Sequence, residues 1–280
     1  MDRPNSIIEI IIKRSSRRNY RTEQLNRNIL KQISNLLTSP PAGPFGGKST
    51  FQLLHKSIAI DQKIKLGTYG FISGAQYFIV GKTVSSPEAF VDFGYRLEWI
   101  ILQLTALGLG SCWLGGSFKR SEFAKLLDLK ESEIIPAVTP VGYATDKRSV
   151  RDKLIRLGAG SKNRKFWSEL FFDNNFEHPL TSNDIGEFAT VLEMVRLAPS
   201  ASNKQPWRIV KIGSIYHFFL QRTPGYGKIF PEIDLQKVDL GIAMCHFEMT
   251  AKEMDLRGHW KYLDPNISLP ENSEYIHSWV

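Results

Sequence analysis

Two long apolar segments with the same opening residues constrain the fold of this chain more than any other feature. Residues 90–107 and 238–254 contain no proline, and each predicts a buried helix. The first contains Val-Asp-Phe-Gly from position 91 and the second opens with Val-Asp-Leu-Gly. The same spacing then relates two further pairs of residues, which are Leu109 and Leu256, and Trp113 and Trp260. A recurrence of this length indicates that one unit occurs twice, as in a fused dimer rather than a solenoid.

Short apolar runs accompany each long helix. Those at 50–55, 76–80 and 138–143 predict strands in the first part of the chain, and those at 208–212 and 216–220 predict a hairpin in the second. Further helices are expected at 8–12, 25–37 and 184–197, and a closing strand at 259–263. This succession predicts an α+β fold in which two related halves form an intramolecular pseudo-dimer, with mixed or antiparallel central sheets flanked by helices.

The junction between the halves is expected within 166–179. We therefore divide the chain into a first half, residues 1–170, and a shorter second half, residues 171–280.

The composition is that of a globular protein, with 42% hydrophobic and 23% charged residues among 280. No apolar run approaches the roughly 20 residues that span a bilayer. Residues 7–12 are too short for a secretory signal and precede the basic residues instead of following them. The two cysteines, Cys112 and Cys245, lie in apolar surroundings and are expected to be buried thiols of a reducing, cytoplasmic compartment.

The net charge of +8 leaves two interpretations open, a nucleic-acid partner or a small anionic ligand. Basic residues gather at 13–21 and 147–165, but aromatic residues do not alternate with them along a strand. The charge alone therefore does not decide between the two.

The segment 14–20 reads Arg-Ser-Ser-Arg-Arg-Asn-Tyr. A guanidinium group presents a rigid fork that suits phosphate oxygens, and a serine hydroxyl adds a neutral donor. Arg14, Ser16 and Arg18 are thus candidate anion ligands. Lys162 and Arg164 could hold the same anion from the far end of the first half. Two cations at this spacing are also typical of an exposed linker, so this alternative stays open.

Two other segments carry candidate ligand contacts. The loop 198–207 offers uncharged donors and acceptors, or else a turn that satisfies its own backbone. Its candidates are Ser200, Ser202, Asn203 and Gln205. The glycine-rich segment 108–116 lets a backbone approach a flat ligand, or simply ends the helix before it.

Taken together, these segments resemble the motifs of the nitroreductase family. The segment 14–20 resembles its opening Arg-Arg-Ser-x-Arg-x-Phe, and 198–207 resembles its Ala-Pro-Ser-x-x-Asn-x-Gln-Pro-Trp loop. The segment 108–116 resembles its Gly-Leu-Gly-Ser stretch, and residues 140–143 with the basic run after them resemble its closing strand. The loop here lies in the second half, and Ser15 stands where the family has arginine. This order resembles a subgroup in which two nitroreductase-like units are fused and have diverged.

The resemblance implies an FMN-dependent oxidoreductase that passes hydride from NAD(P)H to a small organic acceptor such as a nitro compound or a quinone. Arg14, Ser16, Arg18, Lys162 and Arg164 would hold the phosphate and ribityl chain. The second half would add Ser200, Ser202, Asn203 and Gln205, and the backbone of Leu114, Gly115 and Gly116 would lie beside the flavin ring. The turn 67–70 would border the cofactor. No side chain is assigned as a general acid or base, and no metal is expected.

We also expect one FMN in each chain, and a monomer that acts as its own pseudo-dimer. Two other functions remain open from the sequence. The protein could bind FMN as a store or sensor without turnover, or it could be a basic nucleic-acid-binding protein.

Overall fold

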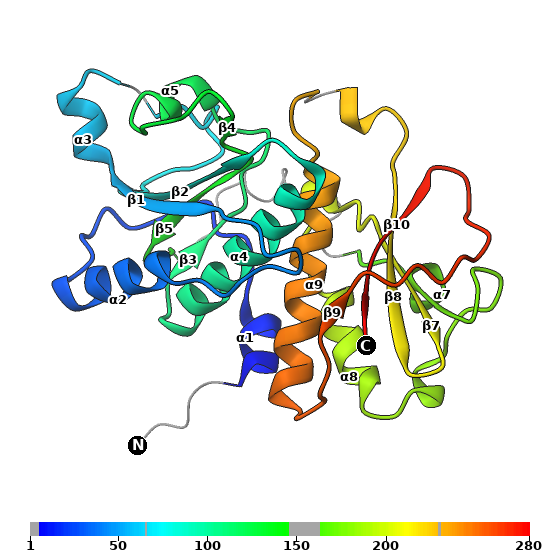
Figure 1. Cartoon of the computed structure of the whole chain (residues 1–280). Helices are drawn as coiled ribbons and strands as arrows, with labels where there is room; N and C mark the ends of the chain where they lie inside the picture. Colours follow the sequence, from blue (N-terminus) through cyan, green and yellow to red (C-terminus); the bar gives the residue numbers. More distant parts are fainter. Residues whose placement is uncertain (1–5, 65, 146–162, 229–230) are drawn as a thin grey trace.

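Two five-stranded sheets lie on either side of a pair of long helices (Figure 1). The computed structural model describes residues 6–64, 66–145, 163–228 and 231–280. The two helices are α4 (Pro87–Ala106) and α9 (Leu235–Glu253), and they pack along each other through the centre of the molecule. This is the α+β arrangement that the sequence predicts.

The first sheet is antiparallel throughout and has the order β1-β2-β5-β3, with β4 paired to one end of β2. Its central strand β2 is buried over its first five residues, because side chains cover both of its faces. The strands are β1 (Thr50–His55), β2 (Tyr77–Val84), β3 (Gly110–Ser111), β4 (Glu133–Ile134) and β5 (Val138–Gly142).

The second sheet is mixed and has the order β6-β7-β8-β10-β9, in which only β6 and β7 are parallel. The expected hairpin is present as β7 and β8, and Gly213 with φ 59° provides the left-handed residue of its tight turn. The strands are β6 (Phe171–Asp173), β7 (Trp207–Ile212), β8 (Ile215–Gln221), β9 (Trp260–Lys261) and β10 (Ser273–Trp279).

The edge strand of this sheet is shorter than the sequence predicts. The expected strand at 259–263 is only the two-residue β9, and the long partner of β8 is β10. Strand β10 escaped notice because serine, glutamate and histidine interrupt its apolar residues, although its last four side chains are buried.

The two long helices meet at their recurring glycines. A Cβ atom on Gly94 would come within 2.0 Å of the Val238 carbonyl oxygen, and one on Gly241 within 1.8 Å of the Val91 carbonyl oxygen. Each glycine therefore allows the backbone of the other helix to approach. Such reciprocal contacts are those of a two-fold interface, here within a single chain.

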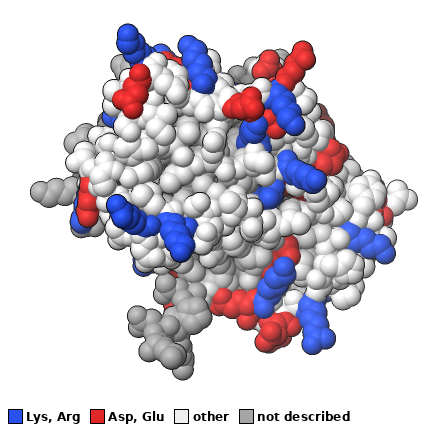
Figure 2. Space-filling view, turned by 60° about the vertical axis from the view of Figure 1, so that its left-hand side comes forward, with Lys and Arg blue, Asp and Glu red and all other residues white. Residues whose placement is uncertain are grey.

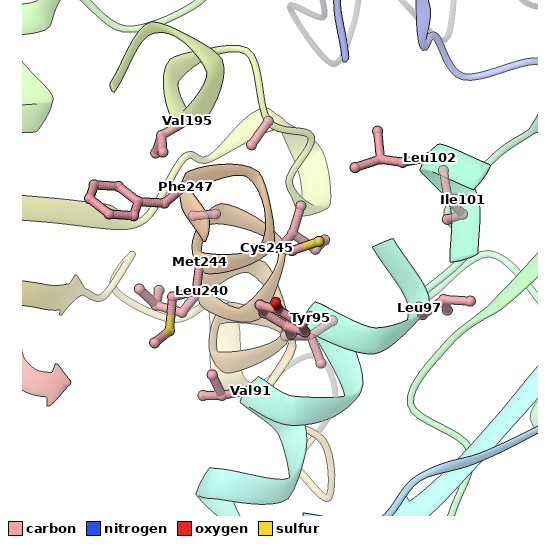
Figure 3. Close-up of a cluster of buried hydrophobic side chains, with 14 of the residues drawn as sticks. Val91, Tyr95, Leu97, Ile101, Leu102, Val195, Leu240, Met244, Cys245 and Phe247 are labelled. Carbon is pink, nitrogen blue, oxygen red and sulfur yellow. The ribbon is translucent and has the colours of Figure 1, made fainter. Parts of the chain in front are cut away.

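A continuous hydrophobic core surrounds this crossing (Figure 3). Tyr95 of α4 and Met244 and Phe247 of α9 are almost completely buried in it. Helix α8 (Phe188–Arg196) packs on α9, and it starts four residues later than expected, after a 3₁₀ turn at Ser182–Asp184. The other helices among the described residues are α1 (Ile7–Lys13), α2 (Arg27–Thr38), α3 (Lys56–Asp61), α5 (Arg120–Ala124) and α7 (Trp167–Leu170), with 3₁₀ turns at Ala201–Asn203 and Tyr226–Lys228. Among the described residues, no helix combines the length and the apolar character needed to cross a membrane.

Candidate functional site

A cavity of about 560 Å³ opens between the start of α9 and the segments that follow α1 and β3. Lys162 lies outside the described residues, and Gln205 does not line the cavity. The other predicted site residues all line it, and they are Arg14, Ser16, Arg18, Leu114, Gly115, Gly116, Arg164, Ser200, Ser202 and Asn203. The fold thus brings residues of four distant segments to one place.

Arginines from both ends of the first half meet at this cavity. Arg14 follows the last residue of α1, and its side chain is only 7% exposed. Its Nε atom lies 3.7 Å from Glu98 Oε1 and makes no hydrogen bond within the described part of the chain. Arg164 donates to Asn203 Oδ1 at 2.6 Å and to the Leu197 carbonyl at 3.1 Å. With Arg18, these residues give the cavity a positively charged wall.

A buried polar network fixes the residues beside Arg14. Glu98 of α4 is fully buried, with Oε1 2.9 Å from His246 Nε2, and Oε2 accepts the Trp113 indole N–H at 2.6 Å. The other nitrogen of His246 donates to the Met194 carbonyl at 2.9 Å, since a carbonyl oxygen can only accept. Arg14 and Trp113 line the cavity, so this network positions part of its wall. No sequence pattern indicates a role for Glu98 or His246 in the site.

The polar loop after α8 is braced by its own side chains. The Gln205 N–H donates to Ser200 Oγ at 2.9 Å, and its side chain accepts from Lys165 N and donates to the Asn203 carbonyl. Ser202, Asn203 and Gln205 have φ values of 50°, 55° and 49°. Left-handed backbone at three non-glycine residues persists only where surrounding bonds hold it. The buried Gln205 therefore shapes the loop from behind, while Ser200, Ser202 and Asn203 face the cavity.

The glycine segment forms the opposite wall. Leu114 exchanges two backbone hydrogen bonds of 3.0 Å with Val138, which anchors the segment to β5. A Cβ atom on Gly115 would lie 2.9 Å from Leu235 Cδ2, so this glycine allows α9 to approach. The Gly115 carbonyl accepts from Arg120 Nη2 at 2.7 Å.

One face of α9 completes the wall, and the sequence analysis missed it. Leu235, Val238, Asp239 and Ile242 lie at the spacing of one helix face, and all four line the cavity. The recurring motif had marked positions 238 and 239, but as packing residues. Tyr69, in the turn expected to border the ligand, lines the cavity, as does Tyr226.

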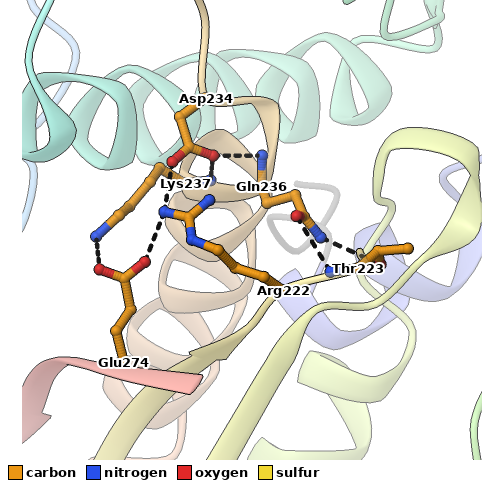
Figure 4. Close-up of polar contacts among 6 residues, drawn as sticks. All are labelled: Arg222, Thr223, Asp234, Gln236, Lys237 and Glu274. Carbon is orange, nitrogen blue, oxygen red and sulfur yellow. Dashed lines mark hydrogen bonds and ion pairs between the residues drawn. The ribbon is translucent and has the colours of Figure 1, made fainter. Parts of the chain in front are cut away.

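The start of α9 is held by a salt-bridge network (Figure 4). Arg222 bonds Asp234 at 2.7 Å and Glu274 at 2.6 Å, and Glu274 also bonds Lys237 at 2.9 Å. Asp234 Oδ1 accepts the backbone N–H groups of Gln236 and Lys237, which caps the helix. The network connects α9 to β8 and β10, and so fixes the face that lines the cavity.

Asp239 has an unusual environment. It is 3% exposed, its Oδ1 accepts the Ala201 N–H at 2.9 Å, and its Oδ2 has no partner among the described residues. Burial raises the pKa of Asp239 well above its ordinary value, and the charge of Asp234 adds to this while the Ala201 N–H opposes it. Burial also raises the pKa of Tyr226, whose hydroxyl lies 3.3 Å from Ser202 Oγ.

Comparison with known proteins identifies the family. Residues 6–251 match a family described as "Putative TM nitroreductase". This chain belongs to that nitroreductase family. A crystal structure of a putative nitroreductase from Thermotoga maritima has the same fold, with a TM-score of 0.62. The two sequences are 21% identical, and the match covers 100% of this chain and 95% of that one.

Other nitroreductase structures align with about half of this chain. A nitroreductase of Desulfitobacterium hafniense with bound FMN is 19% identical and covers 51% of this chain and 92% of its own, with a TM-score of 0.43. A family protein of Clostridium novyi is also 19% identical and covers 50% and 86%, with the same TM-score. No curated protein matches the sequence.

The surface charge of this nitroreductase is mixed on the face shown in Figure 2. Lysines and arginines there are interspersed with aspartates and glutamates and form no continuous basic stripe. The arginines Arg14, Arg18 and Arg164 instead line the cavity. On this face, therefore, the net charge offers no extended track for a nucleic-acid backbone.

Proposed function

We propose that this nitroreductase binds FMN in the cavity and passes hydride from NADH or NADPH to a small organic acceptor such as a nitro compound or a quinone. The observation that carries the proposal is that Arg14, Arg18 and Arg164 meet the uncharged loop residues at one cavity. Its volume lies within the range of about 300–1,000 Å³ that is usual for small-molecule sites.

The lining residues fit the chemical groups of FMN. The buried Arg14 Nε, without a hydrogen-bond partner in the described residues, suits a phosphate oxygen. Arg18 and Arg164 would bind the same phosphate, with Lys162 as a further candidate from outside the described residues. Ser16, Ser200, Ser202 and Asn203 suit the ribityl hydroxyls, and Leu114, Gly115 and Gly116 the edge of the ring. FMN would supply the hydride chemistry, and the protein its binding and orientation.

The proposal includes the organisation of the chain. Residues 1–170 and 171–280 would be two diverged copies of one unit, so that a monomer contains a complete site and binds one FMN. A cytoplasmic location, inferred from two buried cysteines without a disulfide, belongs to the same proposal.

Purified protein loaded with FMN tests this function. We expect a flavin absorbance spectrum, one released flavin per chain, and a monomer by light scattering. Steady oxidation of NADH or NADPH should follow when a quinone or nitro compound is added. Bound flavin without any such oxidation would indicate a store or sensor, and a failure to bind FMN would refute the proposal as a whole.

A further inference from the structure

Asp239 lines the cavity and carries a buried carboxyl group. Its Oδ1 atom anchors the polar loop through the Ala201 N–H, at 2.9 Å. Its Oδ2 atom receives no hydrogen bond from the described residues, although the side chain lines the cavity and is 3% exposed. An acceptor left unsatisfied in a buried place is costly, so a partner from a bound molecule is expected there.

The corresponding aspartate of the first repeat shows that anchoring the loop does not explain this oxygen. Asp92 stands at the same place in its motif, and its Oδ1 and Oδ2 accept the N–H groups of Phe45 and Gly47. Both of its oxygens are used to hold a loop. Asp239 holds its loop with one oxygen, and its second oxygen has no hydrogen-bond partner among the described residues.

The charges around Asp239 favour its neutral form. Asp234 at the start of α9 adds to the burial that raises the pKa of Asp239, and burial together with the charge of Asp239 raises the pKa of Tyr226. The cations close to the start of α9, Arg222 and Lys237, are bound to Asp234 and Glu274. Arg14, Arg18 and Arg164 line the same cavity. A neutral carboxyl can donate a hydrogen bond through Oδ2.

We propose that Asp239 is the proton donor of this site and gives the proton on Oδ2 to an oxygen atom of the acceptor as that acceptor is reduced. The inference rests on the proposed function. Leu235, one turn earlier on the same face of α9, contacts Gly115, so Asp239 faces the part of the cavity between the glycine segment and the polar loop. The substrate class is thus an acceptor with an uncharged oxygen, such as a quinone carbonyl or a nitro group.

The proton balance of the reaction needs such a donor. Reduction of a quinone to a hydroquinone takes up two electrons and two protons, and a hydride delivers both electrons and one proton. Asp239 supplies the other proton: its O–H bond breaks, an O–H bond forms on the substrate, and the carboxylate regains a proton from water. A donor whose pKa lies near the working pH serves this step best.

Infrared spectroscopy tests the protonation without any turnover. We expect a protonated-carboxyl band at neutral pH that shifts when FMN binds, is missing from Asp239→Asn and persists in the matched control Asp92→Asn. Asparagine keeps the contact to Ala201 and a donor toward the cavity, so FMN affinity should change by no more than about twofold. Absence of a band that depends on Asp239 would overturn the inference.

The two half-reactions then test the role. In Asp239→Asn, reduction of the flavin by NADH or NADPH should keep the parent rate, whereas reoxidation by a quinone should slow by about 100-fold. Reoxidation by ferricyanide, which takes up electrons without a proton, should be unchanged. Quinone reduction by the parent should fall at high pH as Asp239 loses its proton, and this fall should be absent from Asp239→Asn. If the parent reduces quinones and Asp239→Asn does so at the same rate, the role of Asp239 is refuted while the proposed function stands. If the parent binds no FMN, the proposed function itself is refuted.

Discussion

The cavity beside Trp113 and the matching region beside Trp260 share the same helix packing but differ in the side chains that fill them. Trp113 and Trp260 occupy equivalent places, and each donates its indole N–H at 2.6 Å to a glutamate of its own long helix, Glu98 or Glu248. Each glutamate is also bonded by the opposite helix, Glu98 by His246 at 2.9 Å and Glu248 by Tyr95 at 2.7 Å. The packing of the two repeats is therefore alike around the helix crossing.

Beyond this helix packing the two regions diverge. Trp113 lines an open cavity, whereas Trp260 stacks on His277, and the Phe45 ring lies 4.6 Å from the same histidine. We call the group Phe45, Trp260 and His277 the aromatic plug. At the repeat spacing, Gly115 and Gly116 correspond to Tyr262 and Leu263. The residues that pack the two helices are thus alike in both regions, whereas aromatic side chains lie around Trp260 where glycines lie beside Trp113.

The largest effect is expected from the glycines that both repeats share. In Gly241→Ala the new Cβ would lie 1.8 Å from the Val91 carbonyl oxygen and 2.7 Å from Tyr95 N. Backbone cannot yield as a side chain can, so unfolding free energy should fall by at least about 3 kcal/mol. Chemical denaturation measures this, with Gly227→Ala, which meets nothing within 4 Å, as the control. A much smaller loss for Gly94→Ala would break the equivalence of the repeats.

The next effect concerns the arginine that the second repeat lacks. Arg14→Ala should weaken FMN binding by about 10- to 100-fold, because a charge-assisted hydrogen bond contributes about 1.5–3 kcal/mol. Fluorescence titration of the apoprotein measures it, and Arg21→Ala, which removes an exposed arginine outside the cavity, is the control. Equal affinities for Arg14→Ala and the parent would show that the cavity wall does not bind the phosphate.

The two aspartates should respond to the same substitution with opposite signs at neutral pH. In Asp92→Asn an amide N–H₂ replaces an acceptor of the Phe45 and Gly47 amides, so stability should fall by about 1–3 kcal/mol. Asp239→Asn removes no such acceptor, since Oδ2 has no partner in the described residues.

The pH dependence of stability tests the protonation of Asp239. The raised pKa of Asp239 means that the folded chain keeps a proton that the unfolded chain loses, so parent stability falls as pH rises above about 4 toward the folded pKa. Asp239→Asn lacks this fall and should gain stability over the parent across that window. Thermal melts at several pH values measure both variants. A pH-independent difference between Asp239→Asn and the parent would show that Asp239 is ionised throughout.

Local patterns predicted the two long helices, α1, α2, α8 and the hairpin, because those elements depend on neighbouring residues, whereas the short helices α3, α5 and α7 were not predicted. The recurring Val-Asp-x-Gly motif also predicted that α4 and α9 belong to equivalent units. The bond between Glu98 and His246 joins residues 148 positions apart, and no local pattern reports such a distance. Gln205 has the same amide chemistry whether it contacts a ligand or braces a loop, so its side-chain environment could be found only in the folded chain.

The smallest effect on flavin binding is expected from removing a ring of the aromatic plug. Phe45→Ala removes the ring that contacts His277, and the loss of buried aromatic area should lower stability without creating a second flavin site. The polar side chains that would complete such a site are missing, because the loop 39–47 offers proline, glycine and alanine where the other loop has Ser200, Ser202 and Asn203. Residues 179–187 likewise contain no arginine to match Arg14 and Arg18. Released flavin should therefore stay at one per chain in Phe45→Ala at saturating FMN. A ratio approaching two would show that the plug alone, and not the lost polar side chains, keeps the second region empty of flavin.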